Sequence, residues 1–426
     1  MGWLDRRAFL VRTGLSLAAA ALAVAPGDAA PLTQTGPDLS DWAAVRALFN
    51  LNPNLLHFGG LYLASHPTPV RDAIEAHRAG LDDNPVDYLH QNQARLEAEV
   101  LRNAAAYLGV APVDIALTDS TTMGLGLLYT GLKVRSDQEL LTTTHDFYAT
   151  HEALHLKAQR SGATLRMVPL YANAANASED EIVSSLAAAI TPMTRVIAAT
   201  WVHSSTGVKL PIRALADIVT AANASRDVGD RALLCVDGVH GLGAEEADLP
   251  LLGCDFFVAG CHKWLFGPRG TGVVWGDPRA WSAAAPTIPT FSDASSLAGA
   301  MTPGGFHSFE HRWALAQAFD LHRRLGMSRV ATRIHALNRQ LKDGLAAMAH
   351  VRLHTPLDDN LSAGLVCFEV AGLSPQAVVD RLHADGIVAT VTPYTTSYAR
   401  LAAGLFNSPE EVDAVLRSVA ALGRGG

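Results

Sequence analysis

The sequence has few cysteines, few charged residues and no long apolar run. Only four of its 426 residues are cysteines, no two of them have Cys-x-x-Cys spacing, and each has an apolar or glycine neighbour. They are expected to be buried thiols, and neither a disulfide nor a metal site is predicted. No apolar run reaches the roughly 18 residues of a membrane-spanning helix, so the mature chain is expected to be soluble.

The chain also lacks an excess of positive charge. Lysine and arginine number 33 against 41 aspartates and glutamates, which gives a net charge of −8. Proteins that bind nucleic acids usually carry a basic surface that displaces counterions from phosphates, so DNA and RNA are not expected as partners. Hydrophobic residues make up 49% of the chain, together with 35 glycines and 21 prolines, which is typical of a globular enzyme.

The first 29 residues resemble a twin-arginine export signal. Arg6 and Arg7 precede an apolar stretch over residues 15–25, and Pro26 and small residues follow at 27–29. The stretch is too short to cross a bilayer as a permanent helix. A signal for the general secretory route, or a fortuitous arginine pair, is the alternative. The prediction is export by the twin-arginine machinery to the periplasm.

Short β-rich runs alternate with helical stretches between about residues 113 and 275. Most of these runs are apolar throughout, as strands are when both faces of a sheet are covered. The pattern predicts an α/β protein of one mostly parallel, seven-stranded sheet wrapped by helices. The seven runs are 115–117, 139–141, 164–168, 196–199, 233–236, 256–258 and 272–275.

The chain is long enough for a large domain and a smaller one. Four parts are predicted: the signal (1–29), an N-terminal arm (30–70), a large cofactor-binding domain (71–320) and a small α+β domain (321–426), to which the arm contributes. Residues 31–54 are polar and rich in proline, which favours an arm over a core element.

Other patterns predict individual elements. Helical spacing recurs over residues 70–79 and 93–108, and the Asp-Asp-Asn-Pro sequence at 82–85 interrupts it. In the small domain, strands are expected at 364–370 and 387–391.

An acidic and a basic residue follow two consecutive predicted strands. Asp237 closes the run at 233–236, and Lys263 follows the run at 256–258 within His-Lys-Trp-Leu-Phe-Gly-Pro. Neighbouring parallel strands end at the same edge of a sheet, so both side chains can reach one crevice. Pyridoxal 5'-phosphate (PLP) requires a lysine amine for its aldehyde and a carboxylate for its ring nitrogen. The spacing therefore predicts a PLP site.

These motifs resemble those of the class V aminotransferases of PLP fold type I, a group that holds cysteine desulfurases, kynureninase and isopenicillin N epimerase. The resemblance runs over about residues 51–423. It implies that Lys263 bonds to the cofactor aldehyde and that Asp237 pairs with the ring nitrogen. It also implies that His240 lies near the phenolic oxygen of the ring and that His262 touches the phosphate.

Further motifs match the family upstream of the lysine. Thr121 and Thr122 lie where a strand passes into a helix, a position that suits a phosphate, although a plain helix cap is the alternative. His145 is the match for the aromatic residue over the cofactor ring, where it could also relay protons, and Phe147 is the alternative. Ser204 matches the residue that approaches the cofactor oxygen, with a surface turn as the alternative.

The C-terminal part of the chain matches the family's motifs at one position and departs from them at two. Arg400 matches the arginine that binds a substrate carboxylate, a task suited to a planar guanidinium. The family's desulfurases carry a catalytic cysteine shortly before this arginine, whereas residues 388–400 contain none, which disfavours persulfide chemistry. Where a partner subunit's threonine usually reaches the phosphate, residues 303–307 read Pro-Gly-Gly-Phe-His, so that contact stays open. Family likeness implies a homodimer.

Residues 57–67 and 82–85 look most like the isopenicillin N epimerase branch, whose exported members include enzymes that tailor the glutamate side chain of the siderophore pyoverdine. The prediction is a periplasmic PLP-dependent enzyme that acts on the amino group of an amino acid, free or linked in a peptide or siderophore. The expected reaction is transamination or a related oxidative conversion. A racemase, epimerase or lyase is the alternative, and a non-catalytic exported ligand-binding protein is the alternative from another class.

Overall fold

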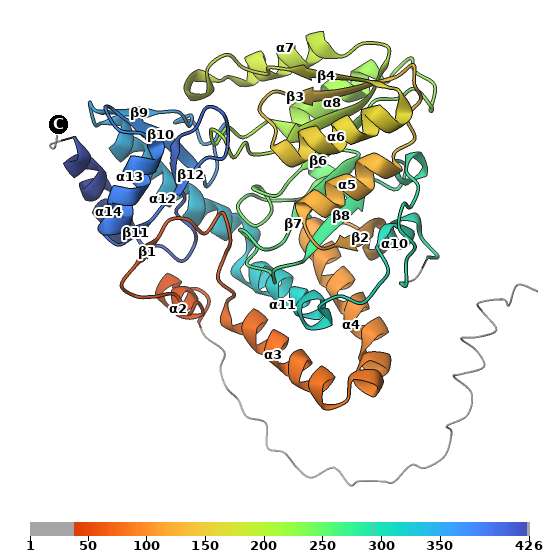
Figure 1. The fold of residues 1–426 in the computed structure, drawn as a ribbon, viewed down its shortest axis with the longest axis horizontal. Helices are drawn as coiled ribbons and strands as arrows, with labels where there is room; N and C mark the ends of the chain where they lie inside the picture. Colours follow the sequence, from red (N-terminus) through yellow and green to blue (C-terminus); the bar gives the residue numbers. More distant parts are fainter. Residues whose placement is uncertain (1–37, 293, 424–426) are drawn as a thin grey trace, which may run out of the picture. The chain divides into compact units, whose positions relative to one another are not determined.

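The computed structural model describes residues 38–292 and 294–423, which belong to one compact unit, Asp38–Gly426 (Figure 1). The predicted export signal lies outside the described residues. Within them, no helix has the length and apolar character needed to cross a bilayer.

A seven-stranded sheet lies at the centre of this unit. Strands β4, β3, β5, β6 and β7 pair in parallel, and β8 runs antiparallel to both of its neighbours, β7 and β2. The predicted sheet is thereby confirmed, because each apolar run became one of its strands. The strands are β2 (Ile115–Thr118), β3 (Glu139–Thr143), β4 (Thr164–Val168), β5 (Thr194–Thr200), β6 (Leu233–Asp237), β7 (Phe256–Gly260) and β8 (Gly272–Gly276).

Helices cover both faces of the sheet, which is why most of its strands are apolar. On β5, Val196 and Ala198 join one hydrophobic cluster with residues of α5 (Thr121–Gly131) and α6 (Tyr148–Ser161). The alternate residues of β5, Ile197 and Ala199, join another cluster with α7 and α8. Successive strand residues point to opposite faces, so the two clusters mark the two layers of helices. The second layer comprises α7 (Glu179–Ala189) and α8 (Ile212–Ala222).

Three long helices pack together beside the sheet (Figure 1). The predicted helices at 70–79 and 93–108 lie within α3 (Thr68–Asp83) and α4 (Pro85–Leu108), and both contact α11 (Phe309–Leu325). The interruption between α3 and α4 falls at Asn84, whose side chain accepts a hydrogen bond from the first turn of α4.

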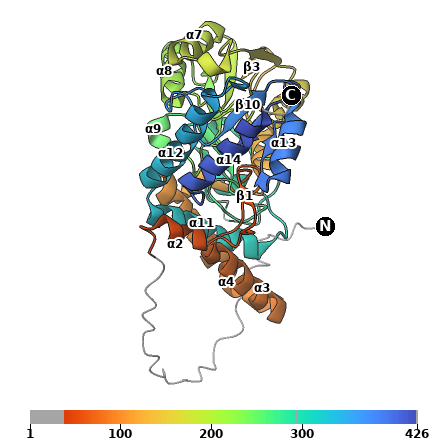
Figure 2. The ribbon, with the colours of Figure 1, turned by 90° about the vertical axis from the view of Figure 1, so that its left-hand side faces the viewer.

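The C-terminal region is built around a second, antiparallel sheet in the order β12-β13-β10-β9. Helices α12 and α13 lie against it, and α14 packs on both of these helices (Figure 2). The division into large and small domains at residue 320 stays a prediction. The elements are β9 (Val351–Leu353), β10 (Val366–Val370), β12 (Thr390–Val391), β13 (Ala399–Leu401), α12 (Met327–Ala346), α13 (Pro375–Ala384) and α14 (Pro409–Leu422).

The expected strand at 387–391 is divided between two sheets. β11 (Ile387–Val388) pairs in parallel with β1 (Leu56–His57), whereas β12 pairs with β13. The N-terminal segment therefore contacts the C-terminal region through backbone hydrogen bonds. The remaining helical elements are α9 (Leu249–Leu252), α10 (Leu297–Met301) and the 3-10 turns Pro112–Asp114, Ala174–Asn176 and Trp281–Ala283.

The prediction of a polar arm over residues 31–54 is wrong for its second half. Residues Trp42–Ala47 form helix α2, which Asp41 caps, and Val45, Leu48 and Phe49 are buried in the main core. The helix has fewer than two full turns, so its apolar residues are too few to stand out as a periodic pattern. The four cysteines are buried and unpaired, as expected: Cys235, Cys254, Cys261 and Cys367.

Candidate active site

A cavity of about 370 Å³ opens at the carboxyl ends of the parallel strands, and we call it the carboxyl-edge cavity. Every predicted site residue except His145 lines it. The lining side chains come from the N-terminal segment, the start of α5, the ends of β5, β6 and β7, and the region around β12 and β13. They are Leu61, Tyr62, Leu63, Ser120, Thr121, Thr122, Phe147, Ala149, Thr200, Ser204, Asp237, Val239, His240, His262, Lys263, Pro393 and Arg400.

Asp237 and Lys263 reach this cavity from neighbouring strands. Asp237 is the last residue of β6, is buried, and accepts a hydrogen bond from the N–H of Val239 at 3.1 Å. Burial raises the pKa of Asp237, against the opposing effects of the Val239 hydrogen bond and of Lys263. Burial likewise lowers the pKa of Lys263, which favours the neutral amine that a nucleophile requires.

His240 lies under the lysine amine. Its Nε2 is 3.2 Å from Lys263 Nζ, and its Nδ1 accepts a hydrogen bond from Trp264 Nε1 at 3.4 Å. Burial lowers the pKa of His240 far below its usual value, so the ring is neutral. The contact places the imidazole of His240 within hydrogen-bond distance of the lysine amine.

The start of α5 forms a polar cradle at one end of the cavity. Ser120 caps the helix, and the hydroxyl of Thr121 accepts a hydrogen bond from the N–H of Gly260 at 2.8 Å. A Cβ atom at Gly260 would lie 3.0 Å from that hydroxyl and 3.1 Å from the His262 ring, so glycine permits the close approach. Free helix N–H groups, hydroxyls and an imidazole suit a phosphate group.

His145 does not line the cavity, and its predicted position over the cofactor ring stays a prediction. Its imidazole stacks on Tyr171, with the ring centres 3.8 Å apart, and its Nε2 accepts a hydrogen bond from the N–H of Leu170. Phe147, the alternative, lines the cavity. Asp146 fixes this turn, because its buried carboxylate accepts hydrogen bonds from residues of β3 and from the N–H of Thr200.

Arg400 is a buried cation that reaches the cavity from β13. Its Nε donates to Thr390 Oγ1 at 3.0 Å and its Nη1 donates to the carbonyl of Ser204 at 2.8 Å. Among the described residues no carboxylate contacts its guanidinium. A buried guanidinium with neutral partners only, facing a cavity, is suited to bind an anionic group.

Sequence reasoning missed several residues of this site. Tyr394 is hydrogen-bonded to Ser204, with 2.6 Å between the two hydroxyl oxygens, and Tyr62 stands at the mouth of the cavity with 68% of its surface exposed. The hydroxyl of Thr200 is buried without a hydrogen-bond partner. No local motif marks these residues, because each reaches the site from a distant part of the chain.

The cavity fits PLP in its chemistry. It offers a lysine amine for the aldehyde, a buried carboxylate for the ring nitrogen and a helix start for the phosphate, and the unpaired hydroxyl of Thr200 leaves one further donor available. The described residues contain no cluster of side chains that could hold a metal ion.

Comparisons with known proteins agree with this chemistry. The sequence profile of the family described as aminotransferase class-V matches residues 64–415. The isopenicillin N epimerase of Streptomyces clavuligerus is 24% identical over 405 residues, which cover 90% of this chain and 99% of that protein. A probable cysteine desulfurase of Mycolicibacterium paratuberculosis is 26% identical over 91% of this chain and 58% of its own length.

The fold is shared with solved structures of PLP proteins. A mutant of C-DES, with glycine linked covalently to its PLP cofactor, matches with a TM-score of 0.80 and 23% identity over 88% of this chain and 98% of that one. The fold is therefore that of PLP fold type I, as the sequence predicted.

Proposed function

The chain belongs to the class V aminotransferase family and is a PLP-dependent enzyme, and from this premise we propose that it acts on the amino group of an amino acid, either free or linked in a peptide such as a siderophore. The observation that carries this proposal is the presence of Lys263 and Arg400 in one cavity. An amine-reactive centre and a buried cation together suit a substrate that carries both an amino group and a carboxylate.

Each side chain of the cavity has a separate task in this proposal. When bound, PLP supplies an aldehyde that accepts the substrate amine and a ring that withdraws electrons from the substrate α-carbon. Asp237 holds the proton on the ring nitrogen, and Thr121, Thr122 and the start of α5 bind the phosphate. The neutral amine of Lys263 moves the proton at the α-carbon.

The proposed reaction is transamination or a related oxidative conversion, of which tailoring of the glutamate side chain of pyoverdine is one form. Persulfide chemistry is disfavoured because residues 388–400 contain no cysteine. Cys367 does not substitute for one, since it is buried in β10, where burial raises the pKa of its thiol to about 12. Epimerisation is the second candidate, and the similarity to isopenicillin N epimerase over nearly the full chain favours it.

Product analysis separates these candidates. The PLP-loaded protein is incubated with amino acids and amino-acid-bearing peptides, and the products are identified by mass spectrometry and chiral chromatography. A keto acid, or an amide formed with loss of the carboxylate, supports the proposal. An inverted stereocentre with the amine retained supports epimerisation. Absence of turnover and of any change in the cofactor spectrum with every compound would favour a ligand-binding protein.

Substitution of Arg400 tests how the substrate is recognised. In Arg400→Gln the KM for a carboxylate substrate is expected to rise by at least about 30-fold, because loss of a buried ion pair costs about 2–5 kcal/mol. The absorption spectrum of the bound cofactor should stay unchanged. Steady-state kinetics with an amino acid and with its amide provide the measurement, since the amide lacks the charge and should respond much less. An unchanged KM would make Arg400 structural. Arg352→Gln, on exposed surface of β9, is the control.

Location in the periplasm is part of the proposal, and the arginine pair at Arg6 and Arg7 supports it. Replacement of both arginines by lysine is expected to keep the protein in the cytoplasmic fraction, because twin-arginine signals are read by a receptor. Immunoblots of periplasmic and cytoplasmic fractions measure this. Unchanged export of the variant would favour the general secretory route.

Assembly into a homodimer is also proposed. Large apolar side chains are exposed on the segment that precedes α11, where Phe291 and Phe306 have 69% and 85% of their surface exposed. Phe291 also borders a groove of about 840 Å³ along α4. Such apolar exposure is typical of an interaction surface. Analytical ultracentrifugation of the PLP-loaded protein measures its oligomeric state. A monomer would contradict the proposed homodimer.

A further inference from the structure

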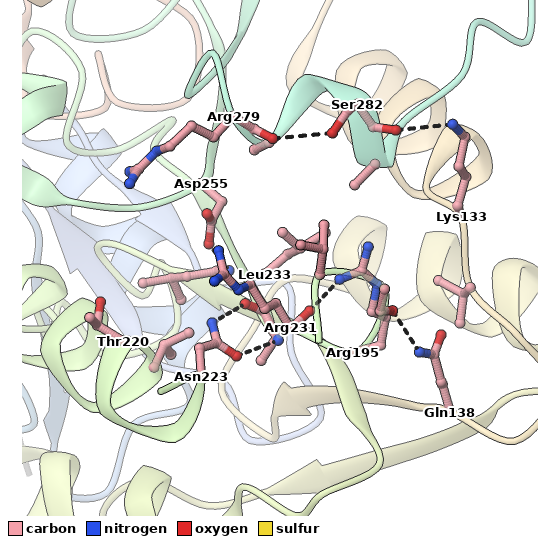
Figure 3. A pocket seen from close by; sticks show the side chains of 18 of the residues that line it. Lys133, Gln138, Arg195, Thr220, Asn223, Arg231, Leu233, Asp255, Arg279 and Ser282 are labelled. Atoms are coloured by element: carbon pink, nitrogen blue, oxygen red, sulfur yellow. Dashed lines mark hydrogen bonds between the residues drawn. The ribbon is translucent and has the colours of Figure 1, made fainter. Parts of the chain in front are cut away.

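A second groove lies at the amino ends of the parallel strands, and we call it the amino-edge groove. It has a volume of about 780 Å³, and its lining includes Lys133, Gln138, Arg195, Arg231 and Asp255 (Figure 3). Strands β5, β6 and β7 begin beside this groove and end beside the carboxyl-edge cavity. The groove is therefore separated from the active site by the length of the sheet.

Arg195 is the most unusual residue of the groove. Only 5% of its surface is exposed, its Nη1 donates to the backbone carbonyl of Arg231, and its Nε is buried without a hydrogen-bond partner. Asp230 and Asp255 act on its charge at longer range, and within the described residues no carboxylate forms an ion pair with it. A buried cation without a contacting anion is costly, so an anion in the groove would be stabilised there.

Two exposed cations extend this charge along the groove. Lys133 Nζ donates to the backbone carbonyl of Ser282 at 3.0 Å, and Arg231 makes no ion pair within the described residues. The other two lining arginines, Arg135 and Arg279, are already paired with aspartates. One lining carboxylate, Asp255, accepts a hydrogen bond from the N–H of Leu234.

The walls of the groove are held by hydrogen bonds to the backbone. The side chain of Asn223 bonds both the N–H and the carbonyl of Ala232, and Gln138 donates to the carbonyl of Gly229 at 3.1 Å (Figure 3). These bonds fix the segment that leads into β6, on which Arg231 is carried. The cationic groups are thus presented by a preformed wall, which reduces the entropy lost on binding.

We propose that the amino-edge groove binds a small organic anion with two or more negative charges, of the phosphate ester or polycarboxylate class. Three cations without carboxylate partners, one of them buried, supply the charge complementarity. The volume lies within the range of small-molecule sites, which is about 300–1,000 Å³. The proposal does not depend on which reaction the carboxyl-edge cavity performs.

Titration calorimetry on the PLP-loaded protein tests this site, because the cofactor then fills the other phosphate position. Inorganic pyrophosphate and citrate are the probes. At least one is expected to bind at a single site with a Kd below about 1 mM and more weakly at high salt. Binding of pyrophosphate alone would indicate that the groove takes phosphate esters. Binding of citrate alone would indicate that it takes polycarboxylates.

Charge-removing variants locate the binding. Lys133→Gln combined with Arg231→Gln is expected to weaken binding at least about tenfold, because two charge-assisted hydrogen bonds are lost at exposed positions. Arg417→Gln, an exposed position on α14, is the control and should bind normally. Arg195→Met should abolish binding. If the Arg195→Met protein does not fold, the Lys133→Gln and Arg231→Gln double variant tests the proposal alone. No saturable binding of either probe, or equal affinity in the double variant, would overturn the proposal.

Discussion

Lys263→Ala is expected to lose the violet absorption band of bound PLP and to lower turnover by at least about 10³-fold. The amine is the only group of the described cavity lining that can bond to the cofactor aldehyde, and a positioned proton-transfer group alone contributes about 10²–10⁴-fold to a rate. The neighbouring His240 holds this amine in place through the 3.2 Å contact between Nε2 and Nζ. Absorption spectra and steady-state rates of the purified variant provide the measurement.

A matched control separates the chemistry from folding. Lys209 is a second partly buried lysine, paired with Glu245 at 2.8 Å outside the carboxyl-edge cavity. Lys209→Ala should keep the violet band and the rate, even where its thermal stability is lower. Retention of the band by Lys263→Ala, with near-normal turnover, would remove the basis for the mechanism.

Asp237→Asn is expected to bind PLP but to lower kcat by at least about 10²-fold, the usual cost of removing one preorganised electrostatic partner of a reaction. Asparagine has nearly the same shape as aspartate but carries no negative charge, so it cannot hold a proton on the ring nitrogen. Burial already raises the pKa of Asp237 in the protein without cofactor. Removal of this buried charge should therefore not impair folding, and the effect of the substitution should appear as a lower kcat.

Asp255→Asn is the matched control for this variant. Asp255 is also a carboxylate beside a central strand and is partly buried, but it lies at the amino edge, where it accepts a hydrogen bond from the N–H of Leu234. Its substitution is expected to leave kcat within about threefold, because it touches neither cofactor nor substrate. If both variants lost the same fraction of kcat, the effect would come from the removal of any buried carboxylate in the sheet. It would then not depend on the position of Asp237 at the ring nitrogen.

The sheet and the central pair of site residues could be predicted from local sequence. Strands covered on both faces are mostly apolar, so the runs were recognisable without knowledge of their neighbours. The convergence of Asp237 and Lys263 followed from one topological rule, because consecutive parallel strands end at one edge. Arg400 and Thr121 were found through family motifs, and both line the cavity.

Long-range packing decided the rest. Whether His145 or Phe147 faces the cavity depends on the buried carboxylate of Asp146, whose partner at Thr200 lies on another strand. Tyr394 reaches Ser204 from the C-terminal region, and no sequence pattern predicts that contact.

The sequence by itself determined the class of fold and the cofactor and predicted the lysine that would bond to it, because apolar runs and a strand-end motif are local properties. The tertiary structure alone decided which aromatic ring faces the cavity, how the strand at 387–391 is shared between two sheets, and that Arg195 is buried without a carboxylate partner. These features depend on groups that are distant in the chain and that meet only when the helices and sheets pack.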